Sequence, residues 1–277
     1  GIEDVVRRAL QEDHAWADAT TLAVVPGNAF ASGKIIAKEA GVMAGKAYVD
    51  AAFQICCPEG DFVWCAHDGD QVSPGLVVLN CSGLAHGLLA AERTALNFLQ
   101  QFSGVATMTA DAVSQAGEIQ VLDTRKTTPG LRDGQKAAVL SGGGVNHRRD
   151  LEDQILLKEN HFALSGISYA ETVASAVKRG GGKIVGAEAQ DLSQAMQALE
   201  AGANYVMLDN FPQASLAESI GDIRCKFPEA DVELSGGLTP ESLKQFASLG
   251  VTRVSLGAIT HSAPALDFSF LFDAPLP

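Results

Sequence analysis

Arginine, lysine and histidine side chains gather in residues 123–161 of a chain that is otherwise acidic. These 39 residues hold seven of the 20 lysines and arginines and two of the six histidines, although the whole chain of 277 residues has a formal net charge of −13. A guanidinium group binds a carboxylate through two parallel hydrogen bonds, whereas the ammonium group of lysine is a point charge suited to a pyrophosphate. The segment therefore predicts a site for a small polyanion. The candidate carboxylate ligands are Arg125, His147 and Arg148, and the candidate pyrophosphate ligands are Lys126 and Lys158.

The elements that must position these side chains are short apolar runs that alternate with helical stretches after residue 118. This alternation is typical of a parallel sheet with crossover helices, and the number of units favours an α/β barrel. The active site of such a barrel lies at the C-terminal ends of its strands, and nearly every strand expected here ends in polar or glycine-rich residues. The expected strands are Ile119–Asp123, Ala137–Leu140, Gln154–Lys158, Lys183–Glu188, Tyr205–Asp209, Val232–Ser235 and Arg253–Leu256, and the expected helices include Tyr169–Arg179, Leu192–Ala201 and Pro240–Leu249.

Glycines follow the last two expected strands. Ser235, Gly236 and Gly237 come after one of them, and Gly257 and Ala258 come after the next. Backbone amides exposed at glycines can bind phosphate oxygens, since no side chain stands in the way. A single Ser-Gly-Gly is usually only a turn, but two such segments at successive late strands predict a phosphate site.

Two carboxylates end consecutive expected strands. Glu188 and Asp209 could hold ribose hydroxyls or a Mg²⁺ ion, because carboxylate oxygens are preferred ligands of this metal. The alternative is structural, with these carboxylates paired to Lys158 or Arg125.

The first hundred residues show a different order of expected helices and strands. A short amphipathic helix is expected from Ile2 to Leu10, strands at Ser32–Lys38 and Asp61–Cys65, and a long apolar helix from Leu84 to Phe102. Arg93 in that helix is the only lysine or arginine between residues 47 and 124. We expect its helical neighbours Leu89, Leu96 and Asn97 to be buried, and a buried arginine needs an anion. That anion is either a structural partner such as Glu92, or a ligand or neighbouring subunit.

The composition excludes several classes of protein. The acidic net charge argues against a nucleic-acid partner and against docking on an anionic membrane. The five cysteines form no Cys-x-x-Cys pair, so a zinc site or a disulfide framework is not expected. No signal core or run of 18 apolar residues exists, and we expect a cytoplasmic location.

Several long motifs of the chain resemble the quinolinate phosphoribosyltransferase family. The similarity extends from the segment around Glu12 to Asp267 and includes the helix that contains Arg93. The motifs that carry it are Ala91–Leu99, Asp123–Arg132, Gly142–Arg148, Lys158–His161, Leu208–Asn210, Ser235–Gly237 and Gly257–Ser262.

The resemblance implies an α/β fold with an N-terminal α/β sandwich domain, here residues 1–104, and an open, TIM-like α/β barrel, here residues 105–264. Residues 265–277 are expected to pack on the first domain. It also implies a homodimer or higher oligomer in which Arg93 serves the partner's site. The implied reaction converts quinolinate and phosphoribosyl pyrophosphate into nicotinate mononucleotide, pyrophosphate and CO₂ with Mg²⁺.

The resemblance also implies roles for individual residues. Quinolinate would contact Arg93, Thr124, Arg125, His147 and Arg148. Lys126 and Lys158 would serve the pyrophosphate and the departing carboxylate, and Glu188 and Asp209 the ribose hydroxyls and the Mg²⁺ complex, in part through substrate and water. The 5′-phosphate would bind at Ser235, Gly236, Gly237, Gly257 and Ala258.

One strand departs from the family pattern. Where the family usually has the alternating form K-I-E-V-E-V-E, this chain has Lys183-Ile-Val-Gly-Ala-Glu-Ala-Gln190. One placement, which needs a one-residue insertion, makes Glu188 the middle carboxylate and puts Gly186 and Gln190 in place of its neighbours.

Three other functions fit parts of the sequence. A related phosphoribosyltransferase with another pyridine or a modified acceptor would share the phosphate half of the site. A Schiff-base aldolase could use Lys158. A carrier module is suggested by the turn at His67–Gly75, but no lysine between residues 47 and 125 could carry a lipoyl or biotinyl group.

Overall fold

The computed structural model describes residues 1–273 and divides the chain into two compact units. The first unit comprises residues 1–110, 127–143 and the chain from residue 259 onward, and the second comprises residues 111–126 and 144–258. Residues 127–143 therefore belong to the first unit, although they lie outside the range expected for the N-terminal domain.

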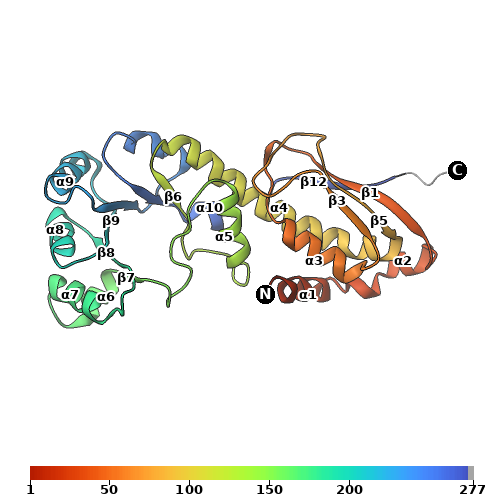
Figure 1. Cartoon of the computed structure of the whole chain (residues 1–277), viewed down its shortest axis with the longest axis horizontal. Helices are drawn as coiled ribbons and strands as arrows, with labels where there is room; N and C mark the ends of the chain where they lie inside the picture. Colours follow the sequence, from red (N-terminus) through yellow and green to blue (C-terminus); the bar gives the residue numbers. More distant parts are fainter. Residues whose placement is uncertain (274–277) are drawn as a thin grey trace. The chain divides into compact units, whose positions relative to one another are not determined.

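The first unit is built on an antiparallel sheet with the strand order β12-β1-β5-β3. The helices α3 and α4 lie beside this sheet, and α1 packs on α3 (Figure 1). The sandwich of helices and sheet is the α/β architecture expected for this part of the chain. The elements are α1 Ile2–Glu12, η1 Ala15–Ala17, α2 Ala19–Val24, β1 Phe30–Ala37, β2 Gly41–Val42, α3 Lys46–Cys56, β3 Asp61–Trp64, β4 Gln71–Val72, β5 Val77–Leu84, α4 Ala85–Ala116, α5 Arg132–Ser141 and β12 Phe268–Phe272.

The strand β12 brings the end of the chain back onto the first unit. It pairs with β1 in antiparallel register, and Phe270 lies opposite Ile35. Phe270 is 9% exposed, and its ring centroid lies 6.1 Å from that of Phe53 in α3. Residues 268–272 of the tail thus pair with β1 of the first unit, while residues 274–277 lie outside the described part of the chain.

One expected strand is a helix. The run Ala137–Leu140 lies within α5, and burial there follows a helical period, with Gly134, Gln135, Ala138 and Val139 buried. Four apolar residues are too few to distinguish a strand from a buried helix segment. The polar residues before the run complete a helix of ten residues.

The second unit contains a six-stranded sheet with the order β6-β11-β10-β9-β8-β7, in which every neighbouring pair is parallel. The sheet is open, with β6 and β7 at its edges, and Val145 adds a parallel bridge to Leu122 in β6. This arrangement confirms the expected α/β class. The elements are β6 Gln120–Leu122, β7 Ile155–Leu157, α6 Glu159–Ser165, α7 Tyr169–Arg179, β8 Val185–Ala189, α8 Leu192–Glu200, β9 Tyr205–Asp209, α9 Gln213–Lys226, β10 Asp231–Ser235, η2 Pro240–Phe246 and β11 Arg253–Ser255. The short helix α10 Ala258–His261 begins at the last residue of this unit and continues in the first unit.

Helices α7 and α8 begin where the sequence offers a cap. The Ser168 hydroxyl accepts the backbone N–H of Glu171, and the Asp191 carboxylate accepts that of Gln194. Such caps satisfy donors that the first helical turn leaves open. The expected helix at Pro240–Leu249 is instead a short 3₁₀ segment that ends at Phe246.

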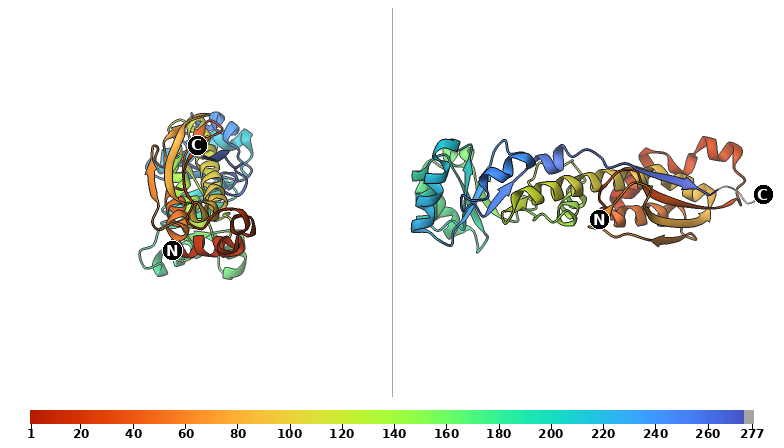
Figure 2. Two further views of the ribbon diagram at one scale, coloured as in Figure 1. Left: turned by 90° about the vertical axis from the view of Figure 1, so that its right-hand side faces the viewer. Right: turned by 90° about the horizontal axis from the view of Figure 1, so that it is seen from above.

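The two faces of the parallel sheet differ in chemistry. Since side chains alternate along a strand, Ala187, Val206, Leu208 and Val232 share one face and are buried. Helices α6–α9 lie together on one side of the strands (Figure 1 and the right-hand view of Figure 2). The opposite face carries polar and charged groups among its side chains. In order across the strands, these residues are Glu188, Tyr205, Met207, Asp209, Glu233, Ser235 and Arg253.

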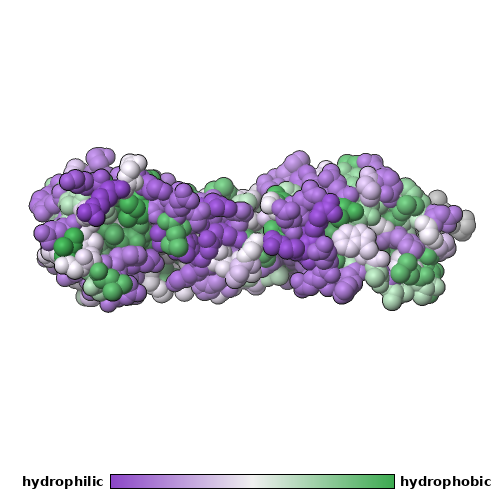
Figure 3. Space-filling view, turned by 90° about the horizontal axis from the view of Figure 1, so that it is seen from below, coloured by the Kyte–Doolittle hydropathy of each residue, from purple (hydrophilic) through white to green (hydrophobic). Residues whose placement is uncertain are grey.

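The molecular surface in Figure 3 is mostly hydrophilic, and its hydrophobic residues form separate patches. Within residues 1–273, no helix has both the length and the apolar character needed to cross a membrane.

We predict that Phe270→Ala lowers the free energy of unfolding by about 3–5 kcal/mol, because it leaves a cavity between β12 and α3. Leu271→Ala is the matched control, since Leu271 is 42% exposed and its loss should change stability by no more than about 0.5 kcal/mol. Urea unfolding followed by tryptophan fluorescence measures both effects, because Trp16 and Trp64, the two tryptophans, belong to the first unit. Equal losses in the two variants would show that the docked tail is not held by Phe270.

Candidate active site

The C-terminal ends of the parallel strands meet at one edge of the sheet in the second unit. Ser235 lies in register with Asp209, and the N–H of Leu256 donates to the carbonyl of Leu122 at 3.0 Å. The segments expected to form the site follow these strand ends and belong to one compact unit. From that unit come Thr124, Arg125, Lys126, His147, Arg148, Lys158, Glu188, Asp209, Ser235, Gly236, Gly237, Gly257 and Ala258, whereas Arg93 belongs to the first unit.

Two arginines at this edge lie close enough to repel each other. Arg148 is only 7% exposed; burial lowers the pKa of its guanidinium, and the charge of Arg125 lowers it further. One amino group of Arg148 donates to the carbonyl of Gln154 at 3.4 Å. The nearby groups of Tyr205, Glu188 and Asp153 act in the opposite direction and raise the pKa of Arg148 in part. Two guanidinium groups at one site suit a ligand with carboxylate groups.

The ring of His147 faces protein groups on both sides. Its Nδ1 accepts the backbone N–H of Arg148 at 2.8 Å, and its Nε2 lies 3.3 Å from Oε1 of Glu233. The backbone N–H of His147 donates to Oδ1 of Asp123 at 2.8 Å. At 6% exposure the imidazole is a buried group behind Arg148.

Glu188 lies between a lysine and a second carboxylate. Its Oε1 is 3.8 Å from Nζ of Lys158, so the structural ion pair considered from the sequence is present. Burial raises the pKa of Glu188, Lys158 lowers it, and the nearby charge of Asp209 raises it again, with a net increase. The carboxylate is thus held in a site that disfavours its charge.

A small cavity of about 90 Å³ adjoins the two carboxylates. Phe162 and Tyr169 stack on one side of it with ring centroids 4.2 Å apart. The hydroxyl of Tyr169 donates to the backbone carbonyl of Glu188 at 2.7 Å and so fixes the end of β8. The cavity is lined by Glu159, Phe162, Tyr169, Glu188, Gln190, Gln194 and Asp209.

The glycines after β10 have a backbone that other residues rarely adopt. Gly236 has φ +94° and Gly237 has φ +63°, and both are exposed. A Cβ on Gly236 would lie 2.5 Å from the side-chain oxygen of Asn210, whereas a Cβ on Gly237 would meet nothing within 4 Å. The turn therefore leaves open space beside exposed amides, as a phosphate site requires.

The structure corrects the expected surroundings of Arg93. Arg93 and Asn97 are exposed on α4, and Leu89 is only half buried, although all three neighbours were expected to be buried. Burial raises the pKa of Glu92, while the charge of Arg93 lowers it. Arg93 is therefore an exposed residue near Glu92 and not part of the core.

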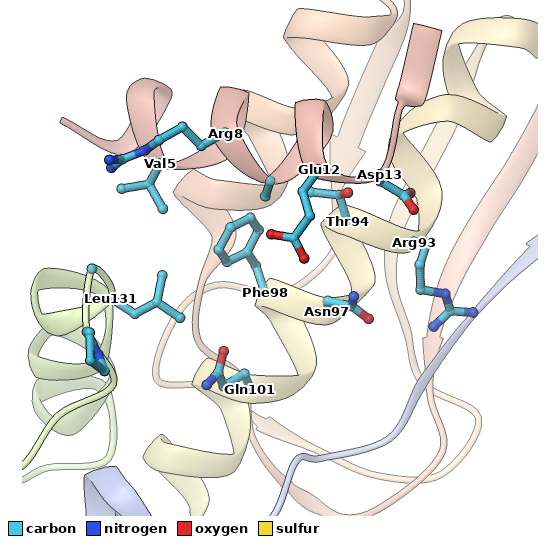
Figure 4. Close-up of a pocket in the computed structure, with 13 residues that line it drawn as sticks. Val5, Arg8, Glu12, Asp13, Arg93, Thr94, Asn97, Phe98, Gln101 and Leu131 are labelled. Atoms are coloured by element: carbon cyan, nitrogen blue, oxygen red, sulfur yellow. The ribbon is translucent and has the colours of Figure 1, made fainter. Parts of the chain in front are cut away.

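Arg93 lines a cavity of about 520 Å³ in the first unit (Figure 4). Arg93 and Asn97 project from α4, and Glu12 and Asp13 come from the end of α1. The cavity thus has charged groups of both signs at its wall. Its lining consists of Val5, Arg8, Ala9, Glu12, Asp13, Arg93, Thr94, Asn97, Phe98, Gln101, Pro129, Gly130 and Leu131.

Three residues on the polar face of the sheet, Tyr205, Glu233 and Arg253, were not predicted from the sequence. Glu233 is fully buried, Arg253 donates to it from the next strand at 2.7 Å, and the Arg253 guanidinium lies 4.2 Å from the ring centroid of Tyr205. A charged residue between two apolar ones, as in Val232-Glu233-Leu234, was the available signal.

The same face explains the departure at Gly186. Gly186 lies opposite Tyr205 in the parallel register, and any Cβ at residue 186 would overlap the Tyr205 ring. The space that a glutamate side chain would need at this position is filled by the tyrosine.

Together, the open parallel sheet and the cationic, carboxylate and glycine groups at its strand ends define an α/β enzyme site for anionic substrates. Two family models cover nearly the whole chain: the quinolinate phosphoribosyl transferase N-terminal domain matches residues 18–103, and the C-terminal domain matches residues 105–271. The chain belongs to the quinolinate phosphoribosyltransferase family.

Individual relatives agree with this assignment. The chain is 40% identical to the nicotinate-nucleotide pyrophosphorylase (carboxylating) of Rattus norvegicus, with 97% of this chain and 91% of the relative covered. It is 35% identical to the chloroplastic enzyme of the same name from Arabidopsis thaliana, over 99% of this chain and 84% of the relative. The crystal structure of NadC from Streptococcus pyogenes superposes with a TM-score of 0.91 at 39% identity and covers 99% of this chain and 97% of that one.

We predict that Glu188→Gln stabilises the protein at neutral pH. Because its pKa is raised on folding, Glu188 binds a proton in the folded state at a pH at which the unfolded chain has lost it. Stability is therefore lost as the pH rises from the usual carboxyl pKa through the raised one, and glutamine avoids this loss.

Thermal unfolding of both proteins between about pH 4 and pH 8 tests this expectation. The advantage of Glu188→Gln should shrink toward the acidic end. Glu229→Gln removes the same charge from an exposed position and should leave the stability curve unchanged. A constant advantage across the pH range would contradict the role of ionised Glu188.

Proposed function

We propose that this protein transfers the phosphoribosyl group of phosphoribosyl pyrophosphate to quinolinate and releases pyrophosphate and CO₂, so that nicotinate mononucleotide forms. The observation that carries the proposal is the pair Arg125 and Arg148, held together at the strand ends in a chain of this family. Quinolinate has two neighbouring carboxylates and matches two guanidinium groups.

We assign direct contact with quinolinate to Arg125 and Arg148, with Thr124 beside them. His147 stands behind Arg148, since both of its ring nitrogens face protein groups. Lys126 and Lys158 supply the positive charge for the leaving pyrophosphate and for the carboxylate that is lost.

The 5′-phosphate is assigned to the exposed turn at Ser235, Gly236 and Gly237 and to the start of α10 at Gly257 and Ala258. The open space beside Gly237 supports this assignment. Binding of the ribose hydroxyls is assigned to Glu188 and Asp209. These residues lie on the neighbouring strands β8 and β9, between the proposed quinolinate site and the proposed phosphate site.

The reaction requires charge of both signs. As pyrophosphate leaves, positive charge develops on the ribose ring and negative charge on the leaving group, and fixed groups of opposite sign stabilise both. Glu188 and Asp209 supply the negative side, and the two lysines supply the positive side. No side chain has to form a covalent bond to the sugar. Loss of CO₂ breaks a carbon–carbon bond and leaves its electron pair on the ring carbon next to the newly quaternised nitrogen. The positive charge of that nitrogen stabilises the electron pair, and the carbon then takes up a proton from solvent to give nicotinate mononucleotide.

The residues present fit a Mg²⁺ ion that is bound jointly by the protein and the substrate. No group of three or more histidine, cysteine, aspartate or glutamate side chains within residues 1–273 could hold a metal alone. Mg²⁺ is commonly bound by one or two carboxylates together with substrate phosphates. Glu188 and Asp209 would hold it with the pyrophosphate, and it would supply charge neutralisation of the leaving group when bound.

The proposal includes a homodimer or a higher oligomer in which Arg93 completes the neighbour's site. The exposure of Arg93 at the wall of a large cavity supports this role, because the guanidinium is open to a second chain. The cytoplasmic location stays a prediction.

The direct test is to incubate the purified protein with quinolinate, phosphoribosyl pyrophosphate and Mg²⁺ and to measure nicotinate mononucleotide. We expect product with quinolinate and none with nicotinate, which lacks the second carboxylate. A preference for nicotinate would overturn the assignment of the acceptor.

We predict that Arg125→Ala removes quinolinate binding while binding of phosphoribosyl pyrophosphate persists, because only the acceptor half of the site loses its charge. Calorimetric titration with each substrate measures this difference. Equal loss of both affinities would contradict a divided site.

We also predict that Arg93→Ala and Arg125→Ala subunits restore each other when mixed. A mixed dimer contains one site with both arginines, so random exchange should recover about a quarter of the wild-type sites. Arg8→Ala subunits mixed with Arg125→Ala are the matched control, since every Arg8→Ala site keeps both arginines and about half of the wild-type sites should be active whether or not the subunits exchange. No recovery in confirmed mixed dimers would exclude the contribution of Arg93 to the neighbour.

A further inference from the structure

The polar face of the sheet in the second unit contains a buried charged cluster that the proposed chemistry does not use. Glu233 in β10 is 0% exposed, and its two carboxylate oxygens face different groups. Oε2 accepts from Nε of Arg253 at 2.7 Å, and Oε1 lies 3.3 Å from Nε2 of His147. A buried carboxylate is retained only when such partners compensate for the water it has lost.

The environment keeps Glu233 charged. Burial by itself would raise the pKa of Glu233, but the contacts with His147, then Arg253 and Ser255, outweigh burial and leave the pKa below its ordinary value. Arg253 donates a hydrogen bond to Oε2, whereas Oε1 meets His147 through a charge contact of 3.3 Å that is not aligned as a hydrogen bond.

The contacts of His147 determine which of its nitrogens carries the proton. Nδ1 accepts the backbone N–H of Arg148 at 2.8 Å, so a neutral ring must carry its hydrogen on Nε2, toward Glu233. The ring of Tyr205 packs against the imidazole with centroids 5.9 Å apart and lies beneath the Arg253 guanidinium. These contacts constrain the orientation of the imidazole, and the acceptor role of Nδ1 favours the tautomer with its hydrogen on Nε2.

We propose that Glu233 is a positioning residue for the acceptor site: through His147 it holds the backbone of Arg148 and keeps that guanidinium beside Arg125. The inference rests on the proposed function, because quinolinate is the ligand assigned to the two arginines. Glu233 itself contacts no substrate in this arrangement.

The variant Glu233→Gln tests the link. A glutamine amide offers one acceptor and one donor, so it satisfies either Arg253 or the Nε2 hydrogen of His147 but not both. If its NH₂ group faces His147, the ring is driven to carry its proton on Nδ1, which then opposes the N–H of Arg148. We expect the KM for quinolinate to rise about tenfold, while the KM for phosphoribosyl pyrophosphate stays within about twofold.

Arg253→Lys is the matched control for loosening of the same buried cluster. It perturbs the other side of Glu233 and the stacking on Tyr205, but leaves the Glu233–His147 contact in place. We expect a lower melting temperature and a KM for quinolinate within about twofold of wild type. An equal rise in KM in both variants would overturn the proposal, because general loosening would then explain the effect.

A double-mutant cycle tests whether Glu233 acts through His147. In His147→Asn, the side-chain oxygen can replace Nδ1 as acceptor for the Arg148 N–H, but no group reaches Glu233. Adding Glu233→Gln to His147→Asn should therefore raise the quinolinate KM no further. Effects that multiply in the double variant would show that the two residues act independently.

Nitrogen-15 NMR of the histidine rings provides a reading that needs no substrate. We expect His147, identified by its absence in His147→Asn, to be bare at Nδ1 and protonated at Nε2, and Glu233→Gln to populate the other tautomer. A wild-type ring protonated on Nδ1 would overturn the proposal even if Glu233→Gln did not fold. If the wild-type protein forms no nicotinate mononucleotide, the proposed function is contradicted. If the wild-type protein is active but Glu233→Gln leaves the tautomer of His147 unchanged, only the role of Glu233 is contradicted.

Discussion

Folding of the second unit brings the guanidinium groups of Arg125 and Arg148 to the same site, where the charge of Arg125 lowers the pKa of Arg148. Both charges stand at one edge of a sheet, and the folded chain must hold them there before any anion arrives. Much of the surrounding structure serves this purpose. Asp123 accepts the backbone N–H of His147, and the imidazole accepts that of Arg148, so the segment after Val145 is anchored from two sides.

The two faces of the parallel sheet differ in the side chains that they bury. Strands in a closed barrel usually fill the interior with branched apolar side chains. Here the sheet is open, and one of its faces holds a buried glutamate, an arginine and a tyrosine among few apolar groups. The opposite face is lined by buried apolar side chains such as Val206 and Leu208. A smaller apolar cluster of Leu156, Tyr205 and Met207 lies on the same face as the buried glutamate.

The sequence allowed prediction of the features that are local or periodic. Strand–helix alternation identified the parallel sheet, and the polar strand ends identified the residues that the fold gathers at its edge. The strand predicted at Ala137–Leu140 was wrong because four apolar residues are too few to show a helical or strand-like repeat. The helical repeat is visible only over the whole of α5, Arg132–Ser141.

Features that depend on distant partners could not be read from the chain. Glu233 gives no sign of the histidine 86 residues before it, because the contact exists only once β10 and the segment after β6 share one face. The exposure of Arg93 was likewise hidden, since an apolar helix does not reveal which of its sides lacks a neighbour. Such contacts are set by topology rather than by local pattern.

The contact between Gly186 and Tyr205 has a consequence for how this family can diversify. Because any side chain at residue 186 collides with the tyrosine ring, the two positions cannot change in arbitrary order. A lineage that gains a carboxylate at residue 186 must first reduce residue 205, and the reverse path requires glycine before the aromatic ring arrives. Substitutions at residues 186 and 205 therefore depend on each other: a larger side chain is tolerated at one position only when the other is small.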